Sequence, residues 1–444
     1  MTNHSNSLAT DAGSDGRRRW VVAGLLCLGM IIAYVSRGNV SVVLALPDFI
    51  KSFHLSDTGR GMINSAFFWA YVALQVPAGW VVDRYGVKFP YAIGFVFWCM
   101  ASASTAFAHS VAQLATLRVL LGVFESLVGP ASITWIRRNF SEVERGLAVG
   151  IYLSGTKIGP AIAAPLTVWL TMRYGWRPMF LLVGIGGAIW LVPWLLLVKN
   201  DAPPIASETK KEDGKATIPF SRIMANPVTW GTVIIAFCYM YFVYFCMTWM
   251  PAYFIEQRHL SISKMGSYTF FSFGGMAVTA ALAGWAADRM ILRGGNPVTV
   301  RKWFTIVGLA IACTELIGAQ TSSVTVALVF AIVSLSGLGL ATANYWALTQ
   351  TLIPASAIGR VSGVVNCSAS LAGLVAPIVT GWLKQRFGGY QAPMQAIWFV
   401  LVLGVLSYLV LMREKYAPRA NLTEGRNSVP PRMNTRDTPG ISGV

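Results

Sequence analysis

Charged residues are scarce in this sequence. Only 12% of the 444 residues are Asp, Glu, Lys or Arg, while 55% are apolar and the mean hydropathy is +0.56. Soluble domains carry about 25% charged residues, so this composition excludes an ordinary soluble protein. Apolar runs near 20 residues, each long enough to cross about 30 Å of hydrocarbon as a helix, recur along the chain. We therefore expect an all-α membrane protein.

Histidine and cysteine are also lacking in the patterns that would indicate chemistry. The four histidines lie in predicted tails or loops, and the six cysteines are scattered singly over predicted helices. The sequence therefore predicts no metal site and no disulfide framework. It also shows no pairing of a nucleophile with a base. We expect a protein that is not an enzyme and needs no cofactor.

The apolar runs form two sets of six predicted transmembrane helices. The first set covers residues 20–46, 60–82, 88–108, 111–137, 145–170 and 176–198. The second set covers residues 228–255, 264–288, 300–319, 323–350, 359–384 and 391–412. We expect six-helix bundles at 20–198 and 228–412, a polar linker at 199–227, and tails at 1–19 and 413–444. The first run is too long for a cleavable signal peptide.

Two segments of the first set recur in the second. GWVVDRYGVK (79–88) matches GWAADRMILR (284–293) at an offset of 205 residues, and WLTMRYG (169–175) matches WLKQRFG (382–388). Many secondary transporters arise by duplication of a membrane domain, with the substrate site between the halves near the bilayer midplane. The duplication therefore indicates a transporter made of two pseudo-symmetric bundles.

The repeated corner between the second and third helices of each half carries conspicuous charges. We expect these charges to act in gating, because contacts at such corners break when the halves rock against each other. A loop that merely stabilises the fold is the alternative. The gating candidates are Asp83, Arg84, Lys88, Asp288 and Arg289.

The net charge of +17 follows from membrane topology. Most lysines and arginines lie in the two tails, the linker and the loops on the same side of the membrane, whereas the opposite loops hold few. This bias predicts that both termini are cytoplasmic in the inner membrane of the cell. It also argues against a nucleic-acid partner, and we expect a monomer in a lipid bilayer. The cations of the opposite loops are Lys51, Arg60, Arg173, Arg177, Arg258, Lys264, Lys384 and Arg386.

A few charges remain inside the predicted helices: Arg37, Arg118, Glu125 and Lys157, with Glu315 less central. A charge in hydrocarbon costs at least about 2.5 kcal/mol, so these groups should face a wet cavity. Surplus positive charge there would attract anions. The alternatives are that Arg37 pairs with an acid on another helix, that Arg118 pairs with Glu125, and that Lys157 reaches the membrane surface.

Glu125 is the candidate proton carrier, because it is the one central acid and no histidine lies within the membrane. The alternative is a permanently ionised partner of Arg118 or Lys157. Arg118 and Glu125 share one helix face but lie about 10 Å apart along it. We therefore expect a third group between them.

The corner motif, the duplication and the twelve helices together resemble the major facilitator superfamily. More narrowly, YVSRGNVSV (34–42), FFWAYVALQVPAGWVVDRYGVK (67–88) and LRVLLGVFESLVGP (117–130) resemble the anion:cation symporter family, which includes bacterial sugar-acid symporters. The resemblance implies that Arg37 and Arg118 surround the anion and that Glu125 is the proton site. It also implies that the sugar-acid contacts are Tyr34, Tyr71, Trp346 and Asn366.

The sequence departs from this family at two positions. Ser36 stands where bacterial members commonly have Asp, which leaves Glu125 as the one titratable acid of that pair. After Ser-Gly the sugar-acid symporters have Gln, where this chain has Thr156 followed by Lys157, so we add both residues to the substrate contacts. The extra cation favours a more strongly anionic substrate such as a dicarboxylate, and a coupling scheme in which Glu125 is paired with Lys157.

The leading hypothesis is proton-coupled import of an organic anion, a sugar acid or another mono- or dicarboxylate, by alternating access. An exporter or anion exchanger is the alternative, because Gly155, Gly159 and Pro160 partly match a GxxxGP stretch of drug antiporters. A membrane sensor would need a soluble signalling domain, which the sequence does not show.

Overall fold

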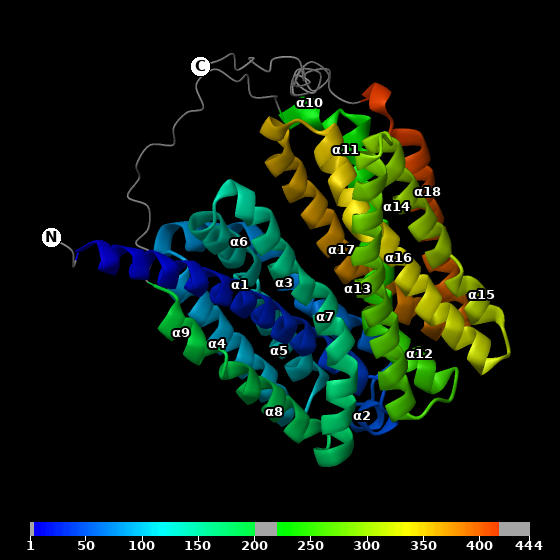
Figure 1. The fold of residues 1–444 in the computed structure, drawn as a ribbon. Helices are drawn as coiled ribbons and strands as arrows, with labels where there is room; N and C mark the ends of the chain where they lie inside the picture. The colour runs from blue at the N-terminus through cyan, green and yellow to red at the C-terminus, as the bar shows by residue number, and fades with distance from the viewer. Residues whose placement is uncertain (1–3, 200–219, 417–444) are drawn as a thin grey trace, which may run out of the picture.

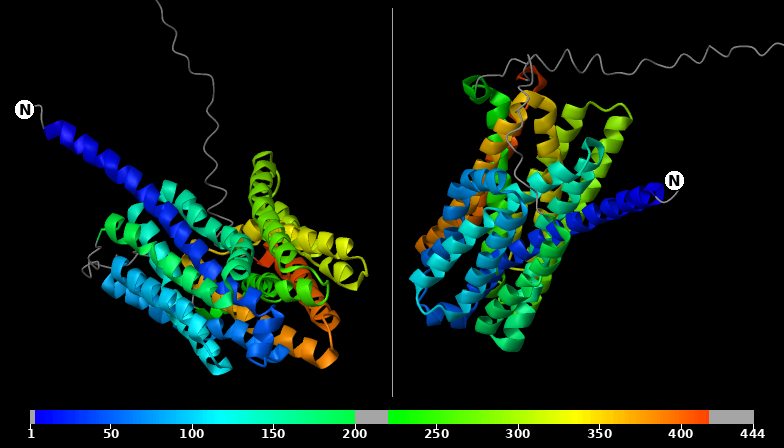
Figure 2. Two further views of the ribbon diagram at one scale, coloured as in Figure 1. Left: turned by 90° about the horizontal axis from the view of Figure 1, so that it is seen from below. Right: turned by 90° about the vertical axis from the view of Figure 1, so that its left-hand side faces the viewer.

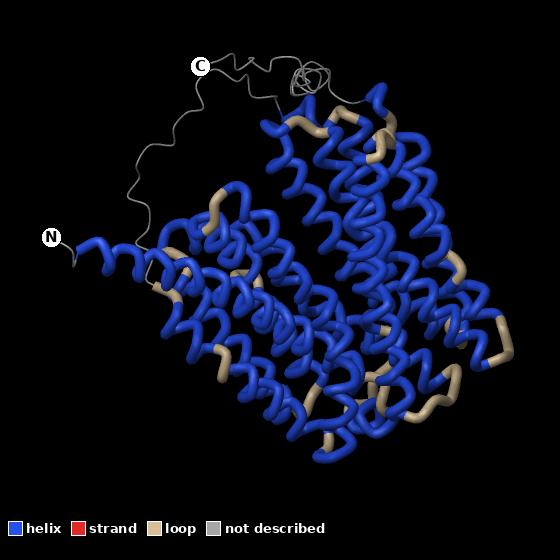
Figure 3. Tube along the Cα trace, in the orientation of Figure 1, coloured by secondary structure: helices blue, strands red, loops and turns tan. Residues whose placement is uncertain are grey.

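Twelve helices long and apolar enough to cross a membrane are present in the computed structural model, which describes residues 4–199 and 220–416. Figure 3 draws helices joined by short loops and no strand within these described ranges. The predicted number of membrane spans and the all-α fold are confirmed. Most of the predicted linker and of the C-terminal tail lies outside the described residues.

The first bundle holds the helices before the linker. The predicted start at residue 20 is too late, because the first helix already begins at His4 (Figure 1). The elements are α1 (His4–Val43), α2 (Pro47–Ser52), α3 (Asp57–Tyr85), α4 (Lys88–Ser104), a short 3-10 turn (Thr105–Phe107), α5 (Val111–Glu125), α6 (Val128–Asn139), α7 (Glu142–Tyr174), α8 (Trp176–Ala188) and α9 (Leu191–Leu197).

The second bundle follows the linker. The predicted helix at 228–255 is divided at Trp249, because Pro251 lies at the start of the next helix and has no backbone N–H to continue the hydrogen-bond ladder. The elements are α10 (Phe220–Met224), α11 (Pro227–Thr248), α12 (Met250–Glu256), α13 (Ile262–Leu292), α14 (Pro297–Ala312), α15 (Glu315–Gln320), α16 (Val324–Leu352), α17 (Ala355–Phe387), α18 (Gln391–Leu411) and a 3-10 turn (Glu414–Tyr416).

Local sequence signals set where these helices begin and end. Several helices start after a Ser or Asn whose side chain accepts a hydrogen bond from a backbone N–H of the first turn, as Ser56 does from Gly59. The repeated segments WLTMRYG and WLKQRFG both end in a glycine with positive φ, Gly175 at 86° and Gly388 at 72°. A residue without Cβ adopts this conformation readily, so both copies stop a long helix in the same way.

The two bundles meet along a few helix pairs. α3 packs on α17, and α7 packs on α13. Gly61 of α3 faces the carbonyl of Pro377 in α17, and Gly381 of α17 faces the carbonyl of Asp57 in α3, so closely that a Cβ at either glycine would meet backbone oxygen. Small residues permit such close approach of membrane helices. The bundles therefore touch backbone to backbone at this crossing.

The bundles approach most closely at one end of the molecule. We call the end that carries α2 and α12 the loop end, and the end that carries the start of α1, α9 and α10 the tail end. In Figure 1 the ribbons of the two bundles come together at the loop end and diverge toward the tail end, and in both views of Figure 2 the start of α1 extends beyond the helices around it. Contacts at the loop end therefore join the halves.

The crossing of α3 and α5 gives a test of packing. Gly122 of α5 lies against the backbone carbonyl of Phe67 in α3, with no room for a Cβ. We expect Gly122→Val to lower the free energy of unfolding by about 1–3 kcal/mol through overpacking. Thermal unfolding of the purified protein in detergent measures this. Gly150→Val is the control, because its Cβ would meet nothing within 4 Å. Equal losses in both variants would show that the close contact at Gly122 is not the cause.

Candidate functional site

A buried ion pair joins α1 to α5 in the first bundle. Nε of Arg37 donates to Oε1 of Glu125 at 2.5 Å. The Arg37 side chain is 6% exposed, and the Glu125 side chain is fully buried. The partner expected between Arg118 and Glu125 is thus Arg37, which comes from another helix. The alternative that Arg37 pairs with an acid on another helix is what this conformation shows, and the alternatives that pair Glu125 with Arg118 or Lys157 are not.

Aromatic rings surround the Arg37 guanidinium. Its central carbon lies 4.8 Å from the ring centroid of Tyr34, 4.6 Å from that of Phe67 and 4.8 Å from that of Tyr71. Phe67 and Tyr71 stack on each other with centroids 5.1 Å apart. Aromatic faces attract a cation, and the attraction grows when water is excluded. The rings therefore help to hold Arg37 charged inside the membrane.

Arg118 binds the backbone of α1. Its Nη1 donates to the carbonyl of Ser36 at 3.3 Å, and its Nη2 donates to the carbonyl of Arg37 at 3.4 Å. Because the bond is to the backbone carbonyl, it does not depend on which side chain stands at position 36. Both hydrogen bonds are long, and Nε of Arg118 has no partner among the described residues. Oε2 of Glu125 is likewise unpartnered there.

Lys157 of α7 reaches across to the second bundle. Its Nζ lies 3.2 Å from the hydroxyl of Tyr239 in α11, and that hydroxyl lies 2.8 Å from the hydroxyl of Thr342 in α16. Lys157 therefore does not pair with Glu125 in this conformation. Lys157 does not reach the membrane surface in this conformation, because its ammonium contacts a tyrosine that is 1% exposed.

The other predicted contacts lie on different helices around this centre. The Thr156 hydroxyl bonds to the carbonyl of Leu153 within α7, at 2.7 Å. Nδ2 of Asn366 in α17 lies 3.5 Å from Oε1 of Gln75 in α3, across the two halves. Trp346 of α16 stands beside Tyr345, whose ring is 5.3 Å from that of Tyr239. The rings of Tyr34 and Tyr71 contact the Arg37 guanidinium.

Glu315, the other buried acid, lies apart from the three cations. It begins α15 in the second bundle, and its Oε2 accepts a hydrogen bond from the Ser334 hydroxyl of α16 at 2.6 Å. Both residues belong to the same bundle. Glu315 thus joins two helices of that bundle and has a partner of its own.

The predicted gating charges lie at the tail end. Asp83 and Arg84 are in the last turns of α3, where the Arg84 guanidinium lies 5.5 Å from the Trp80 ring centroid. Asp288 of α13 pairs with Arg301 of α14 at 3.0 Å, within the second bundle. Lys88 begins α4, and Arg289 lies in the last turn of α13. Their role in gating stays a prediction.

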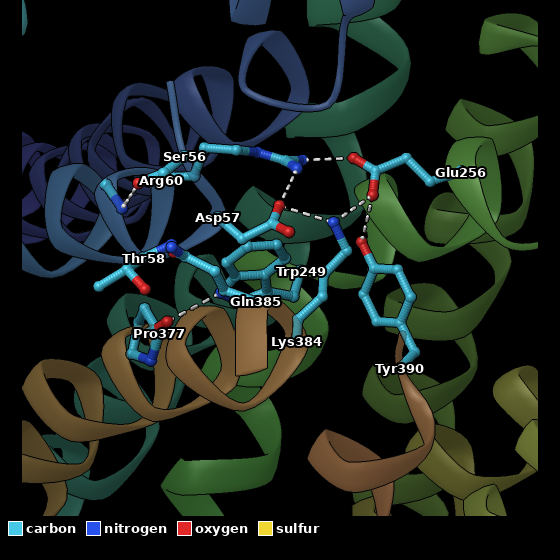
Figure 4. Close-up of polar contacts among 11 residues, drawn as sticks. Ser56, Asp57, Thr58, Arg60, Trp249, Glu256, Pro377, Lys384, Gln385 and Tyr390 are labelled. Atoms are coloured by element: carbon cyan, nitrogen blue, oxygen red, sulfur yellow. Dashed lines mark hydrogen bonds and ion pairs between the residues drawn. The ribbon is translucent and has the colours of Figure 1, made fainter. Parts of the chain in front are cut away.

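A four-membered ion network ties the two halves together at the loop end (Figure 4). Arg60 of α3 pairs with Asp57 at 2.9 Å and, across the halves, with Glu256 of α12 at 2.7 Å. Lys384 of α17 pairs with Asp57 at 2.6 Å and with Glu256 at 2.7 Å. Each carboxylate thus contacts one cation from each bundle, and only 4% of the Arg60 side chain is exposed.

Neutral groups complete this network. The Tyr390 hydroxyl donates to Oε2 of Glu256 at 3.0 Å, and burial together with the Glu256 charge raises its pKa well above the usual value, so it stays a donor. The backbone N–H of Thr58 donates to Oε1 of Gln385 at 3.1 Å. Trp249 lies beside both cations, with its ring centroid 4.9 Å from Cζ of Arg60 and 5.7 Å from Nζ of Lys384.

Sequence reasoning missed the network and the Lys157 partners. The sequence identifies Arg60 and Lys384 only as loop charges. Cations are rare in the loops at that end, and this rarity was the signal that each of them has a specific role. Tyr239 and Thr342 give no sequence signal, because which helix faces Lys157 depends on how the bundles dock.

Comparison with known families agrees with this architecture. Residues 26–377 match the family model described as Major Facilitator Superfamily. The chain belongs to the major facilitator superfamily. Among solved structures, a bacterial homologue of the human lysosomal transporter Spinster, in an inward-facing and unoccupied conformation, superposes on this major facilitator with a TM-score of 0.77. It shares 18% identity, with 90% of this chain and 98% of that chain covered.

Several curated relatives align with this major facilitator over nearly their whole length, and each of them is described as a transporter. The D-galactonate transporter of Escherichia coli O6:H1 is 29% identical, with 91% of this chain and 98% of the relative covered. The probable sulfoacetate transporter SauU of Cupriavidus necator is 28% identical, with 89% and 94% covered. The hexuronate transporter of Bacillus subtilis is 28% identical, with 91% and 97% covered. The chain is thus a multi-pass membrane transporter.

The loop-end network predicts a measurable change in conformation. Glu256→Gln removes the charge that Arg60 and Lys384 share, so we expect the loop ends of this major facilitator to separate more often. Spin labels at the exposed positions 52 and 263, in a background with the exposed Cys367 replaced by Ser, report the distance between halves. We expect a longer-distance population in the variant.

The matched control is Glu144→Gln. Glu144 pairs with Arg19 at 2.6 Å inside the first bundle, so this pair does not join the halves. Its loss should leave the distance distribution unchanged. If Glu256→Gln gives the same distribution as the unaltered protein, the network does not hold the halves together.

Proposed function

We propose that this protein is a secondary active transporter that imports an organic anion by proton symport with alternating access. The observation that carries the proposal is the buried Arg37–Glu125 pair, with Arg118 beside it. An intramembrane ion pair is costly and marks an ion or substrate pathway. The printed names of the relatives, D-galactonate, hexuronate and sulfoacetate transporters, support an organic acid as substrate.

Arg37 and Arg118 would bind the carboxylate of the substrate. A guanidinium offers two parallel N–H donors that fit a carboxylate. The long hydrogen bonds of Arg118 to α1 carbonyls and its unpartnered Nε support its availability. We propose Tyr34, Tyr71, Thr156, Trp346 and Asn366 as further contacts to a sugar acid or another mono- or dicarboxylate.

Glu125 would carry the proton. While it is ionised, it neutralises Arg37, so the site has less attraction for an anion. A proton on Glu125 removes that competitor and frees the guanidinium for the substrate. Anion and proton would therefore bind together, which is the requirement for symport. The unpartnered Oε2 of the buried Glu125 supports this assignment, because it leaves room for a proton.

Access would alternate by rocking of the two bundles. We propose that the tail end is cytoplasmic, in line with its lysines and arginines, and that the loop-end network closes the other side in this conformation. The charged corners at the tail end would close when the network opens. A mechanism of this kind needs a site between the halves, and the contacts of Lys157 and Asn366 across the halves support one.

Arg118 should not tolerate lysine. An ammonium keeps the charge but loses the parallel donors, so we expect Arg118→Lys to lower substrate uptake at least about tenfold. Uptake into proteoliposomes containing equal amounts of purified protein measures this. The exposed Arg293→Lys is the control and should transport normally. Normal uptake by Arg118→Lys would remove Arg118 from the proposed site.

Glu125→Gln should separate binding from coupling. A permanently neutral side chain mimics the protonated acid, so we expect substrate binding and counterflow exchange to persist while accumulation driven by an imposed pH difference is lost. Glu315→Gln is the comparison, because Glu315 has its own partner in the second bundle. If Glu125→Gln still concentrates substrate under a pH difference, the coupling site is elsewhere and Glu315 becomes the next candidate.

Asp83→Asn and Asp288→Asn should affect turnover rather than affinity. Both residues lie at the tail end, away from the central cations, so their loss should slow the change of conformation and leave equilibrium substrate binding close to normal. Initial uptake rates and binding isotherms of the same preparations distinguish the two effects. A large loss of affinity with intact helix content would contradict a gating role.

A further inference from the structure

Lys157 differs from the other two intramembrane cations in what surrounds it. Arg37 has a carboxylate partner, and Arg118 has two backbone carbonyls. Lys157 has one contact with a neutral phenol, at 3.2 Å, and no carboxylate within ion-pair distance in the part of the chain that the structure describes. A phenol hydroxyl compensates a buried ammonium weakly compared with a carboxylate. Lys157 is therefore a charged group that lacks its counter-ion.

The groups around Lys157 can all donate to an anion. An ammonium has three donors, and the hydroxyls of Tyr239 and Thr342 add one each. These hydroxyls lie 2.8 Å apart, Thr342 also donates to the Leu338 carbonyl at 3.4 Å, and both hydroxyls would turn to donate to an anion beside the ammonium. In the present contact the Tyr239 hydroxyl serves as acceptor for Lys157 and can rotate toward an anion. The set fits the oxygens of a carboxylate or a sulfonate.

The charges of the buried side chains indicate how many negative groups of a substrate the site can neutralise. With Glu125 protonated, as proposed for substrate binding, Arg37 and Arg118 share one anionic group, and Lys157 is left as a further cation without one. Tyr34 joins these regions, because its ring centroid lies 4.8 Å from the Arg37 guanidinium and its Cβ packs closely against Gly159 of α7, two residues from Lys157. The packing of α1 on α7 therefore brings the two cationic regions next to each other at Tyr34. One anionic group would leave a buried cation uncompensated.

We propose that Lys157, Tyr239 and Thr342 form a second anion subsite, and that the substrate is therefore an organic acid with two anionic groups. This inference rests on the proposed anion transport and adds the class of anion. One acidic group binds Arg37 and Arg118 in the first bundle. The other replaces the direct Lys157–Tyr239 hydrogen bond and lies between α7 of the first bundle and α11 and α16 of the second. The substrate itself thus links the halves.

Matched pairs of acids test this proposal on the purified full-length protein. Galactarate and D-galactonate differ only in whether carbon 6 is a carboxylate or an alcohol, and sulfoacetate and glycolate differ in a sulfonate against an alcohol. We expect tighter calorimetric binding of the two-anion member of a pair. We expect Lys157→Gln to lower the ratio of the two affinities at least about tenfold, since a charge-assisted hydrogen bond is lost. Lys157→Arg should largely retain the ratio.

Further variants test the subsite even if Lys157→Gln does not fold. Tyr239→Phe removes a single hydroxyl and should lower the ratio several-fold. Combined with Lys157→Gln it should lower the ratio by less than the product of the two effects, because the residues act on one group. The exposed Lys264→Gln is the control and should leave both affinities unchanged.

The outcomes separate this inference from the proposed function. If the protein binds the single-anion acid of each pair as well as the two-anion acid, or if Lys157→Gln leaves the ratio unchanged, the second subsite is refuted while anion transport stands. If it binds no acid of either pair, the proposed function itself fails and the subsite falls with it. A ratio that favours two anionic groups and collapses without Lys157 establishes the subsite, and the preferred pair tells carboxylate from sulfonate.

Discussion

The buried ion pair between Arg37 and Glu125 is the constraint on which the rest of the site depends. Two charges without access to water are tolerable only when they are paired, so α1 and α5 must be packed into the bundle with these side chains facing each other. That packing brings the carbonyls of Ser36 and Arg37 within reach of Arg118, and it positions the rings of Phe67 and Tyr71 against the guanidinium. Breaking the pair by removing one partner would leave a buried charge uncompensated.

The two halves contribute different chemistry. The first bundle holds the three intramembrane cations and the central acid, whereas the second offers hydroxyls and aromatic rings at the same level, such as Tyr239 and Thr342. At the loop end the contributions are equal, since each bundle supplies one cation and one carboxylate. A substrate that binds the cations of the first bundle must still reach the second bundle to influence its position. Contacts across the middle therefore decide whether binding is transmitted to movement.

Hydrophobic run length was sufficient to predict the twelve spans, and the scarcity of charge within them was sufficient to find Arg37, Arg118, Glu125 and Lys157. Their pairing was not predictable, because Arg37 and Glu125 are 88 residues apart and meet only after two helices dock. The break of a helix at Trp249 and the loop-end role of Glu256 depend on the same docking. Local sequence indicates which residues must find partners, and tertiary packing decides which partners they find.

Proton uptake upon substrate binding tests the account most directly. Calorimetric titration of the purified protein with its preferred acid, repeated at one pH in buffers of different ionisation enthalpy, gives the number of protons taken up with each bound anion. If Glu125 must be protonated to release Arg37, binding at a pH where Glu125 is ionised takes up close to one proton, and Glu125→Gln takes up none. Binding without proton uptake, or equal uptake in the two proteins, would contradict the coupling of anion and proton at this ion pair.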